Sequence, residues 1–594
     1  MASRRLRPAF TALAALVAAL CAAGCVSMPT AGPVQSFPVT QGADAQSQQY
    51  VQIVPQPPGK NWTPTDIVKG FLTASASFGS HSDVAREYLT PQEREIWNPF
   101  WSAIVYKNGP TVAAAAVPAP GAKNTVTVQV TGQEQAYLEG HGSYSVPSAS
   151  AQNQPSQGEQ TITLVKMPGG QWRISSAPQE LLLTSDSFDY DYQLRNLYFF
   201  DPDGRFLVPD PVYVPLQASP EELMNGLVDD LISPPKDWLS YGATKTALPV
   251  GTKLSSVTLP GVTAVVNLTG TTITKASSST LEEVSAQLLK TLSGGVQSGT
   301  SGQLVQSVEL ELNGQAWSPP DSQNNPVQSS SKKNTAPGNN PQFYYVDSAG
   351  YLDSRKGEQG KPVRIQHVGT GYSQIAVSPD GSYVAALLGS TLYAGQAGGA
   401  LTKRGTGYVS MSWDLSDDLW ASASAGTQIV MFRGTSGNRQ PLSQKVTVNV
   451  NGNLNLPIST LRVAPDGVRV AIIAGPDSNE LAFGAISGAQ GASPEISLSQ
   501  IQLSPVNATS FTGLTWYGPD DVITLSDPGP VATEYQVSGG TTTSIPVDPG
   551  MKTITASAGN LLIAALPGGQ MDADVSPNAA WVPLGSGSVP AYGG

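Results

Sequence analysis

Cysteine is almost absent from this chain, and histidine is rare. The 594 residues include two cysteines, Cys21 and Cys25, and three histidines. Because no cysteine follows position 25, the body of the chain excludes an internal disulfide and a thiolate zinc site. His81, His141 and His367 stand too far apart for a Glu-x-x-His or His-x-x-x-His metal motif. The sequence therefore predicts no metal and no cofactor.

Charge is also sparse. Charged residues make up 13% of the chain, the formal net charge is −12, and no long basic run occurs. Because phosphate contacts need clustered Lys and Arg, a general nucleic-acid binder is excluded. What is present is 40% apolar residues, 60 glycines and 48 prolines. This composition favours several hydrophobic cores, with many short strands and turns.

The chain opens with an export signal. Arg4, Arg5 and Arg7 precede an apolar run over residues 9–23, which is shorter than the ~20 residues that a membrane-spanning helix needs. We expect residues 1–24 to be a signal peptide.

The end of this signal resembles a bacterial lipobox. Ala22-Ala23-Gly24 leads to Cys25, and leucine is commonest in that motif where this chain has Ala22. The resemblance implies that Cys25 receives a diacylglycerol thioether, becomes the N-terminus and is N-acylated, with palmitate among its acyl chains. The alternative is an ordinary secretory signal with an incidental cysteine. An exposed single thiol would be open to oxidation, which favours lipidation.

Two polar stretches divide the mature chain. Residues 25–61 contain few large apolar groups and are predicted to be the lipidated Cys25 and a flexible tether. Residues 318–341 are similarly polar and are predicted to be a linker between two folded halves.

Residues 62–184 are predicted to form an α+β domain. Thr63-Pro64 and Thr90-Pro91 each combine a helix cap with a proline and predict two helix starts. Strands are predicted by period-two alternation and a Gly-Gly turn at 124–130, 161–165 and 171–174. We expect helices packed on a curved antiparallel sheet, in a cone-like (NTF2-like) domain without a catalytic site.

Residues 190–317 are predicted to form a second α+β domain. Leu197–Phe200 and Phe206–Pro209 are predicted strands around the turn Asp201-Pro-Asp-Gly204. Amphipathic spacing predicts helices at 221–232 and 281–292. Further strands are predicted at 254–259, 263–268 and 305–312.

Residues 342–594 are predicted to be all-β, with a weak repeat. Ile375-Ala-Val-Ser-Pro-Asp-Gly381 corresponds to Leu461-Arg-Val-Ala-Pro-Asp-Gly467. Marker turns near 380, 417, 466 and 520 recur at intervals close to the ~40 to 50 residues of a propeller blade. This pattern predicts a β-propeller of five or six blades, with a pair of β-sandwiches as the alternative.

Taken together, the chain resembles the LpqB-type lipoproteins of actinobacteria. The similar stretches are Phe71-Leu72, Tyr88-Leu89-Thr90, Leu194–Phe200 through Asp201-Pro-Asp-Gly204 to Val208–Val214, and the propeller turns. Leu248-Pro-Val-Gly-Thr252 and Val308–Gly314 are similar to the GerMN module of germination and sporulation proteins.

The resemblance implies a protein that is anchored to the cell membrane and faces its extracytoplasmic side. Members of that family associate with the extracytoplasmic domain of the sensor histidine kinase MtrB. They tune phosphorylation of its response regulator MtrA, which affects envelope, division and development. The implied partners are thus the cytoplasmic membrane, through the lipid anchor, and the kinase, with no nucleic acid.

Two other functions stay open. An exported hydrolase would need a nucleophile with an oriented base, yet no Gly-x-Ser-x-Gly occurs, and Ser329-Ser-Ser-Lys332 lies in the polar linker. Adjacent carboxylates point apart on a strand or helix and are more typical of turns than of a glycosidase or calcium site; they are Asp229-Asp230, Asp417-Asp418 and Asp520-Asp521. A peptidoglycan-binding module would need exposed aromatics, and the candidates are Trp97, Trp101, Trp413 and Trp516.

Overall fold

The computed structural model divides into two compact units. Unit 1 comprises residues 1–97, 112–129 and 161–177, and unit 2 comprises residues 98–111, 130–160 and 178–594. The structure describes residues 55–76, 82–97, 102–114, 124–139, 142–145, 157–216, 219–233, 235, 239, 242–294, 297–298, 303–318, 342–423, 428–433, 442–450, 457–464, 466–488, 495–503, 510–518, 520–527, 531–537, 542–548, 550–557, 561–574 and 581–593.

Both helices predicted from cap-and-proline signals are confirmed in unit 1. Helix α2 (Pro64–Ala76) buries Ile67, Val68 and Phe71, and α3 (Ser82–Glu87) is an additional short helix. Helix α4 (Pro91–Ile96) begins at Thr90, whose hydroxyl accepts from the Glu93 N–H. None of the helices in the described part of the chain is long and apolar enough to cross a membrane.

The sheet that contains the predicted strands has the order β6-β5-β3-β1-β7. The expectation of a curved antiparallel sheet is wrong at one edge, because β1 pairs with β7 in parallel. Strand β1 has no polar alternation, since all four of its residues are buried, and it gave no period-two signal in the sequence. The strands are β1 (Ala103–Tyr106), β2 (Thr111–Val112), β3 (Thr125–Leu138), β4 (Tyr144–Ser145), β5 (Gln157–Lys166), β6 (Trp172–Ser176) and β7 (Leu181–Thr184).

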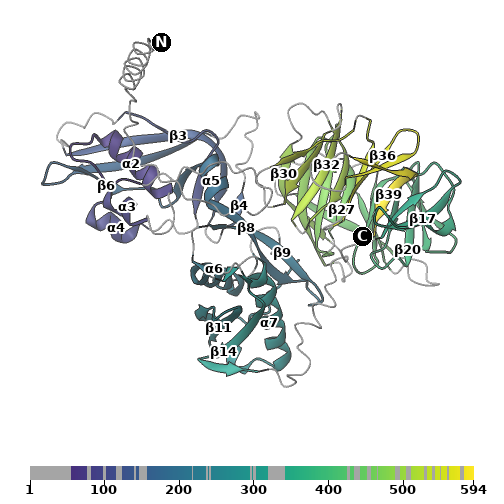
Figure 1. Cartoon of the computed structure of the whole chain (residues 1–594), viewed down its shortest axis with the longest axis horizontal. Helices are drawn as coiled ribbons and strands as arrows, with labels where there is room; N and C mark the ends of the chain where they lie inside the picture. Colours follow the sequence, from purple (N-terminus) through teal and green to yellow (C-terminus); the bar gives the residue numbers. More distant parts are fainter. Residues whose placement is uncertain are drawn as a thin grey trace, which may run out of the picture. The chain divides into compact units, whose positions relative to one another are not determined.

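The second α+β region contains a hairpin and a separate four-stranded sheet (Figure 1). Among the strands of the described residues, β8 (Tyr192–Phe200) and β9 (Leu207–Pro215) pair only with each other. The sheet has the order β10-β11-β14-β15, and its parallel pair β11–β14 requires the crossover that helix α7 supplies. The remaining elements are α5 (Ser185–Asp191), α6 (Pro220–Ile232), β10 (Lys253–Thr258), β11 (Thr263–Thr269), η2 (Ile273–Lys275), α7 (Ser278–Ser293), β12 (Gln297–Ser298), β13 (Gln303–Leu304), β14 (Ser307–Leu312) and β15 (Gln315–Trp317).

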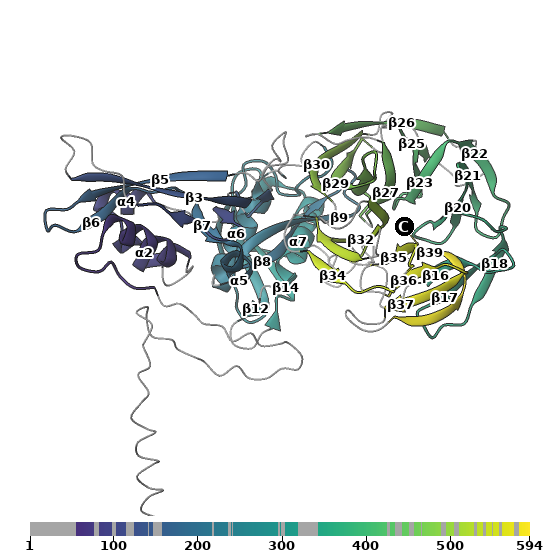
Figure 2. The same ribbon diagram turned by 90° about the horizontal axis from the view of Figure 1, so that it is seen from above.

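The all-β region is a propeller, and its described strands form six blades (Figure 2). Blades three and four are joined into one eight-stranded sheet by the parallel pair β26–β30. The strands are β16 (Gln342–Val346), β17 (Tyr351–Lys356), β18 (Val363–His367), β19 (Gln374–Val377), β20 (Tyr383–Leu388), β21 (Thr391–Gln396), β22 (Thr402–Thr406), β23 (Tyr408–Trp413), β24 (Leu419–Ala423), β25 (Ile429–Arg433), β26 (Leu442–Val450), β27 (Ile458–Val463), β28 (Arg469–Ala474), β29 (Glu480–Ser487), β30 (Glu495–Leu503), β31 (Ser510–Trp516), β32 (Asp521–Asp527), β33 (Ala532–Gln536), β34 (Thr543–Ile545), β35 (Thr553–Thr555), β36 (Leu562–Leu566), β37 (Gln570–Asp574), β38 (Val582–Ser586) and β39 (Ser588–Tyr592).

The C-terminal strand closes the ring. Strand β39 pairs with β16, so the first blade is built from both ends of the propeller sequence. The innermost strands β19, β23, β27, β31, β35 and β39 contact one another in turn around the axis. This closure sets the number of blades at six, within the predicted range of five or six.

The marker turns predicted from the repeat link the innermost strand of a blade to its second strand. In three of them an aspartate accepts the N–H two residues further on, at 2.8 Å in each case: Asp380 from Ser382, Asp414 from Ser416 and Asp466 from Val468. These bonds define Asx turns. The glycines that follow two of these aspartates, Gly381 and Gly467, have φ of 77° and 74°, as the Asp-Gly pattern predicts.

We predict that Gly467→Val destabilises the propeller by about 1–3 kcal/mol, because a β-branched residue resists positive φ. A Cβ at this position would lie 3.6 Å from its nearest neighbour, on Leu415, so the effect reports backbone strain and not a clash. Gly467→Asn is the matched control, because Asn tolerates this conformation. The check is calorimetric melting of both variants; equal melting temperatures would contradict the turn assignment.

Candidate functional site

The turn of the β8–β9 hairpin presents an arginine to the propeller. The Asp201 carboxylate accepts the N–H groups of Arg205 and Phe206, the latter at 2.8 Å, and closes the turn. Gly204 has φ of 72°, which this turn requires. The turn thus fixes the start of the Arg205 side chain.

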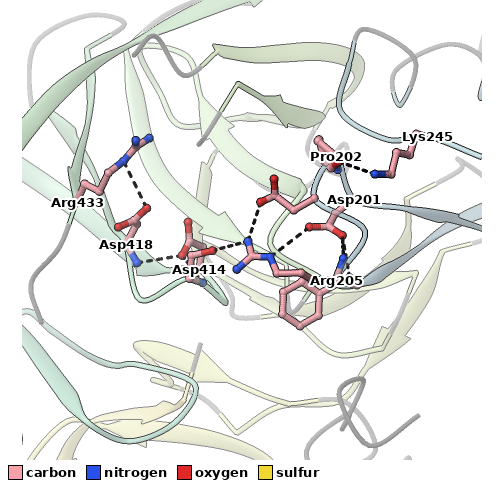
Figure 3. A network of polar contacts seen from close by, with 10 residues as sticks. Asp201, Pro202, Arg205, Lys245, Asp414, Asp418 and Arg433 are labelled. Carbon is pink, nitrogen blue, oxygen red and sulfur yellow. Dashed lines mark hydrogen bonds and ion pairs between the residues drawn. The ribbon is translucent and has the colours of Figure 1, made fainter. Parts of the chain in front are cut away.

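Arg205 connects the hairpin to the β23–β24 turn of blade three (Figure 3). Its Nη2 lies 3.0 Å from Asp203 and donates to the Ser416 hydroxyl at 3.1 Å. Its Nε lies 3.9 Å from Asp201. Because 45% of the Arg205 side chain is exposed, solvent screens these contacts and each contributes little stability.

The turn that receives Arg205 is organised by Asp414. Its carboxylate accepts from the Asp418 N–H at 3.0 Å and from the Trp420 indole N–H at 2.9 Å. Burial raises the pKa of Asp414 in spite of these bonds. Asp418 in turn lies 3.9 Å from Arg433 (Figure 3). This network holds Ser416 in position for the hairpin.

A buried ionic group forms the second polar contact between hairpin and propeller. Arg469, 1% exposed, lies 2.6 Å from Asp466 and 3.3 Å from Asp520. One guanidinium facing two carboxylates leaves one net negative charge. Asn196 of strand β8 donates its amide N–H to Asp520, and this hydrogen bond helps to stabilise the negative charge. Burial nevertheless raises the pKa of Asp520.

An apolar contact accompanies these polar ones. Val208 of β9, together with Leu239 and Ala243, belongs to the same buried cluster as propeller residues from blades four and five. The propeller members include Val468 and Trp516, and the Arg469 guanidinium lies 5.2 Å from the centre of the Trp516 ring. The hairpin is therefore part of a continuous core with the propeller.

The other end of the hairpin carries an aromatic cluster. Phe188 of α5 lies 5.1 Å from Tyr192 and 4.8 Å from Tyr213, measured between ring centroids, and Tyr144 of β4 lies 5.3 Å from Tyr213. Burial raises the pKa of Tyr144 and of Tyr192, so both hydroxyls stay protonated at neutral pH. Within unit 2, the hairpin thus contacts α5 and β4 as well as the propeller.

The predicted site residues occupy different places. Cys25, His81, His141, Trp101 and the segment Ser329–Lys332 lie outside the described residues. His367 packs on the Tyr351 ring with centroids 4.9 Å apart. Three of the tryptophans are buried, at 2%, 0% and 6% exposure, and their faces are not available to sugars; they are Trp97, Trp413 and Trp516.

The members of the adjacent carboxylate pairs have different surroundings. Asp418 is paired with Arg433 and Asp520 with Arg469, whereas burial, Asp520 and Glu534 raise the pKa of Asp521 to about 7. Within the described ranges no three His, Cys, Asp or Glu residues are placed to hold a metal ion.

Sequence reasoning missed Asn196, Arg205 and Arg469. Each has one partner far away in the chain, which a local pattern does not reveal: Asp520 for Asn196 and Arg469, and Ser416 for Arg205. A local signal existed for Asn196 alone, because Arg195 and Asn196 interrupt an otherwise apolar run over residues 194–200.

Three family profiles match successive parts of the chain. "Lipoprotein LpqB, N-terminal domain" matches residues 57–189, "Sporulation and spore germination" matches 196–317, and "Lipoprotein LpqB beta-propeller domain" matches 350–592. The lipoprotein LpqB of Thermobifida fusca is 26% identical, over 98% of this chain and 99% of its own length. The chain belongs to the LpqB family. The lipoprotein LpqB of Streptomyces coelicolor is also 26% identical, over 99% of this chain and 98% of its own.

Similarity of this LpqB family member to solved structures is weaker. The TolB protein of Acinetobacter baumannii is 11% identical with a TM-score of 0.32, covering 42% of this chain and 66% of its own. A streptogramin B lyase is 13% identical with a TM-score of 0.29, covering 43% and 85%. The matched families are named for lipoproteins and germination, and none of their descriptions names an enzyme.

In this LpqB family member, we predict that Arg469→Met lowers propeller stability by about 3–5 kcal/mol, because it leaves Asp466 and Asp520 buried without a cation. Arg205→Ala is the matched control, because Arg205 makes the exposed polar contact between the hairpin and the propeller. Its expected loss of stability is below about 1 kcal/mol. Calorimetric unfolding measures both. Equal losses would contradict the division into a buried and a screened contact.

Proposed function

We propose that this protein is a lipoprotein held by Cys25 on the extracytoplasmic side of the cell membrane. There it acts as an accessory that modulates a sensor histidine kinase of the MtrA–MtrB type, and so influences envelope, division and development. The observation that carries the proposal is membership of the LpqB family, with relatives that match almost the whole chain. The leader that ends in Gly24-Cys25 supports the anchor.

The contact between hairpin and propeller supports a binding role. A protein shifts a kinase between signalling states only by contacting one state better than the other. Such discrimination benefits from a surface whose parts keep their relative positions. The buried Arg469 group and the shared apolar cluster supply that constraint between the hairpin and blades four and five.

We further infer that the output of this protein is binding and not catalysis. The family descriptions name no enzyme. Among the described residues, His367 is the one histidine, and it packs on an aromatic ring with no serine, cysteine or carboxylate bonded to it. An oriented nucleophile and base are what a hydrolase would require.

The experiment that tests the proposal uses the mature protein and the purified extracytoplasmic domain of an MtrB-type kinase. We expect saturable binding, and a changed autophosphorylation rate when the full-length kinase is present in liposomes. The sensor domain of an unrelated kinase is the control. Equal binding to both domains would refute the kinase role, as would strong retention by peptidoglycan without kinase binding.

Membrane anchoring has its own test. Cys25→Ser removes the acceptor thiol, so we expect the protein to move from the membrane fraction to the soluble or secreted fraction. Cys21→Ser is the matched control, because it changes the other cysteine of the leader and leaves the acceptor intact. Immunoblotting of cell fractions gives the measurement. Membrane retention of the Cys25→Ser protein would contradict lipid anchoring.

A further inference from the structure

The free edges of the innermost propeller strands are satisfied by side chains of the neighbouring strands. Gln374 of β19 donates to the Met411 carbonyl of β23 at 2.7 Å and accepts the Met411 N–H at 3.2 Å. The Ser412 hydroxyl of β23 accepts the Val463 N–H at 3.0 Å. On β31, Thr515 accepts the Ala556 N–H at 2.9 Å. The side chains that bond these strand edges are therefore mostly neutral.

Arg462 of β27 is a charged side chain among these neutral ones. Its Nη1 donates to the Ser410 hydroxyl at 3.0 Å, the Met411 carbonyl at 3.3 Å and the Leu461 carbonyl at 2.8 Å. All three acceptors are neutral. The Arg462 carbonyl accepts the Trp516 indole N–H at 3.1 Å, which fixes the backbone. The guanidinium is thus held in place by one of its nitrogens.

The charge of Arg462 has no counter-ion in the described part of the chain. Arg205, Arg364, Arg433 and Arg469 each have a carboxylate within 4 Å, and Arg462 has none. Its Nε and Nη2 have no partner among those residues either, although part of the residue is exposed. Burial lowers the pKa of Arg462 to about 10, so the group is still a cation at neutral pH.

We propose that Arg462 anchors an anion site at the axis of the propeller, which takes a small ligand with a carboxylate or phosphate group. Partly buried charges are normally paired, so a cation fixed without a counter-ion favours an anion there. The Nε and Nη2 donors lie on one edge of the planar guanidinium and match two oxygens of such a group. Strand β27 lies with β23, β35 and β39 around the propeller centre (Figure 2). The inference is independent of the kinase proposal.

The test measures melting temperature and calorimetric binding of the mature protein with citrate or inorganic phosphate, against chloride at equal ionic strength. We expect a saturable stabilisation by at least one of the two anions, lost in Arg462→Gln. Arg364→Gln is the matched control, because Arg364 already pairs with Asp347 and Asp353, and it should bind as the wild type does. The preferred anion shows whether the site takes a carboxylate or a phosphate group.

A second variant guards against misfolding of Arg462→Gln. Arg462→Lys keeps the positive charge and loses the two-nitrogen edge, and we expect binding at least about tenfold weaker with unchanged circular dichroism. The proposal is overturned if wild type shows no more response than chloride produces. It is equally overturned if Arg462→Lys binds as tightly as wild type.

Discussion

The structure of unit 2 depends on a buried charge that must be paired. Arg469 is almost completely buried, and removing an ion from water costs several kcal/mol unless counter-charges compensate. Asp466, in the same blade, supplies one carboxylate, and Asp520, in the next blade, supplies another. Asn196 then adds a donor from outside the propeller. One arginine thereby ties two blades and the hairpin to a single arrangement.

A second constraint acts at the propeller axis. An innermost strand has one edge without a ladder partner, and its N–H and C=O groups must be satisfied. Side chains of neighbouring strands do this, as Gln374 does for Met411 and Trp516 does for Arg462. The closing strand β39 completes the same ring from the C-terminal end. Stability and ring closure are therefore coupled.

Both constraints hold parts of unit 2 in fixed relative positions, which matters for a binding role. LpqB relatives match almost the whole of this chain, and a binding role would need its modules to present defined surfaces. The hairpin contact restrains one module against the propeller by buried groups, while the exposed Arg205 contributes little. The accessory role that we propose would act through differential affinity for the states of its partner.

Elements whose signal lies within a few residues of sequence were predicted correctly. The Thr90-Pro91 helix start, the Asp-Gly turns and the class of the propeller follow from capping, positive φ and repeat spacing, each of which acts within a few residues. The parallel pairing of β1 with β7 could not be predicted, because a fully buried four-residue strand carries no alternation.

The sequence by itself predicted a leader, and it determined the scarcity of cysteine and histidine and the division into mixed helix-and-strand and all-β regions, because composition and periodicity record burial along one element. Tertiary structure alone decided the number of blades, which ring closure fixes, and the partners of Asn196, Arg462 and Arg469. The contacts of Asn196 and Arg469 with Asp520, and of Arg462 with Ser410, join residues distant in the chain, and their energies depend on burial, which no local pattern specifies.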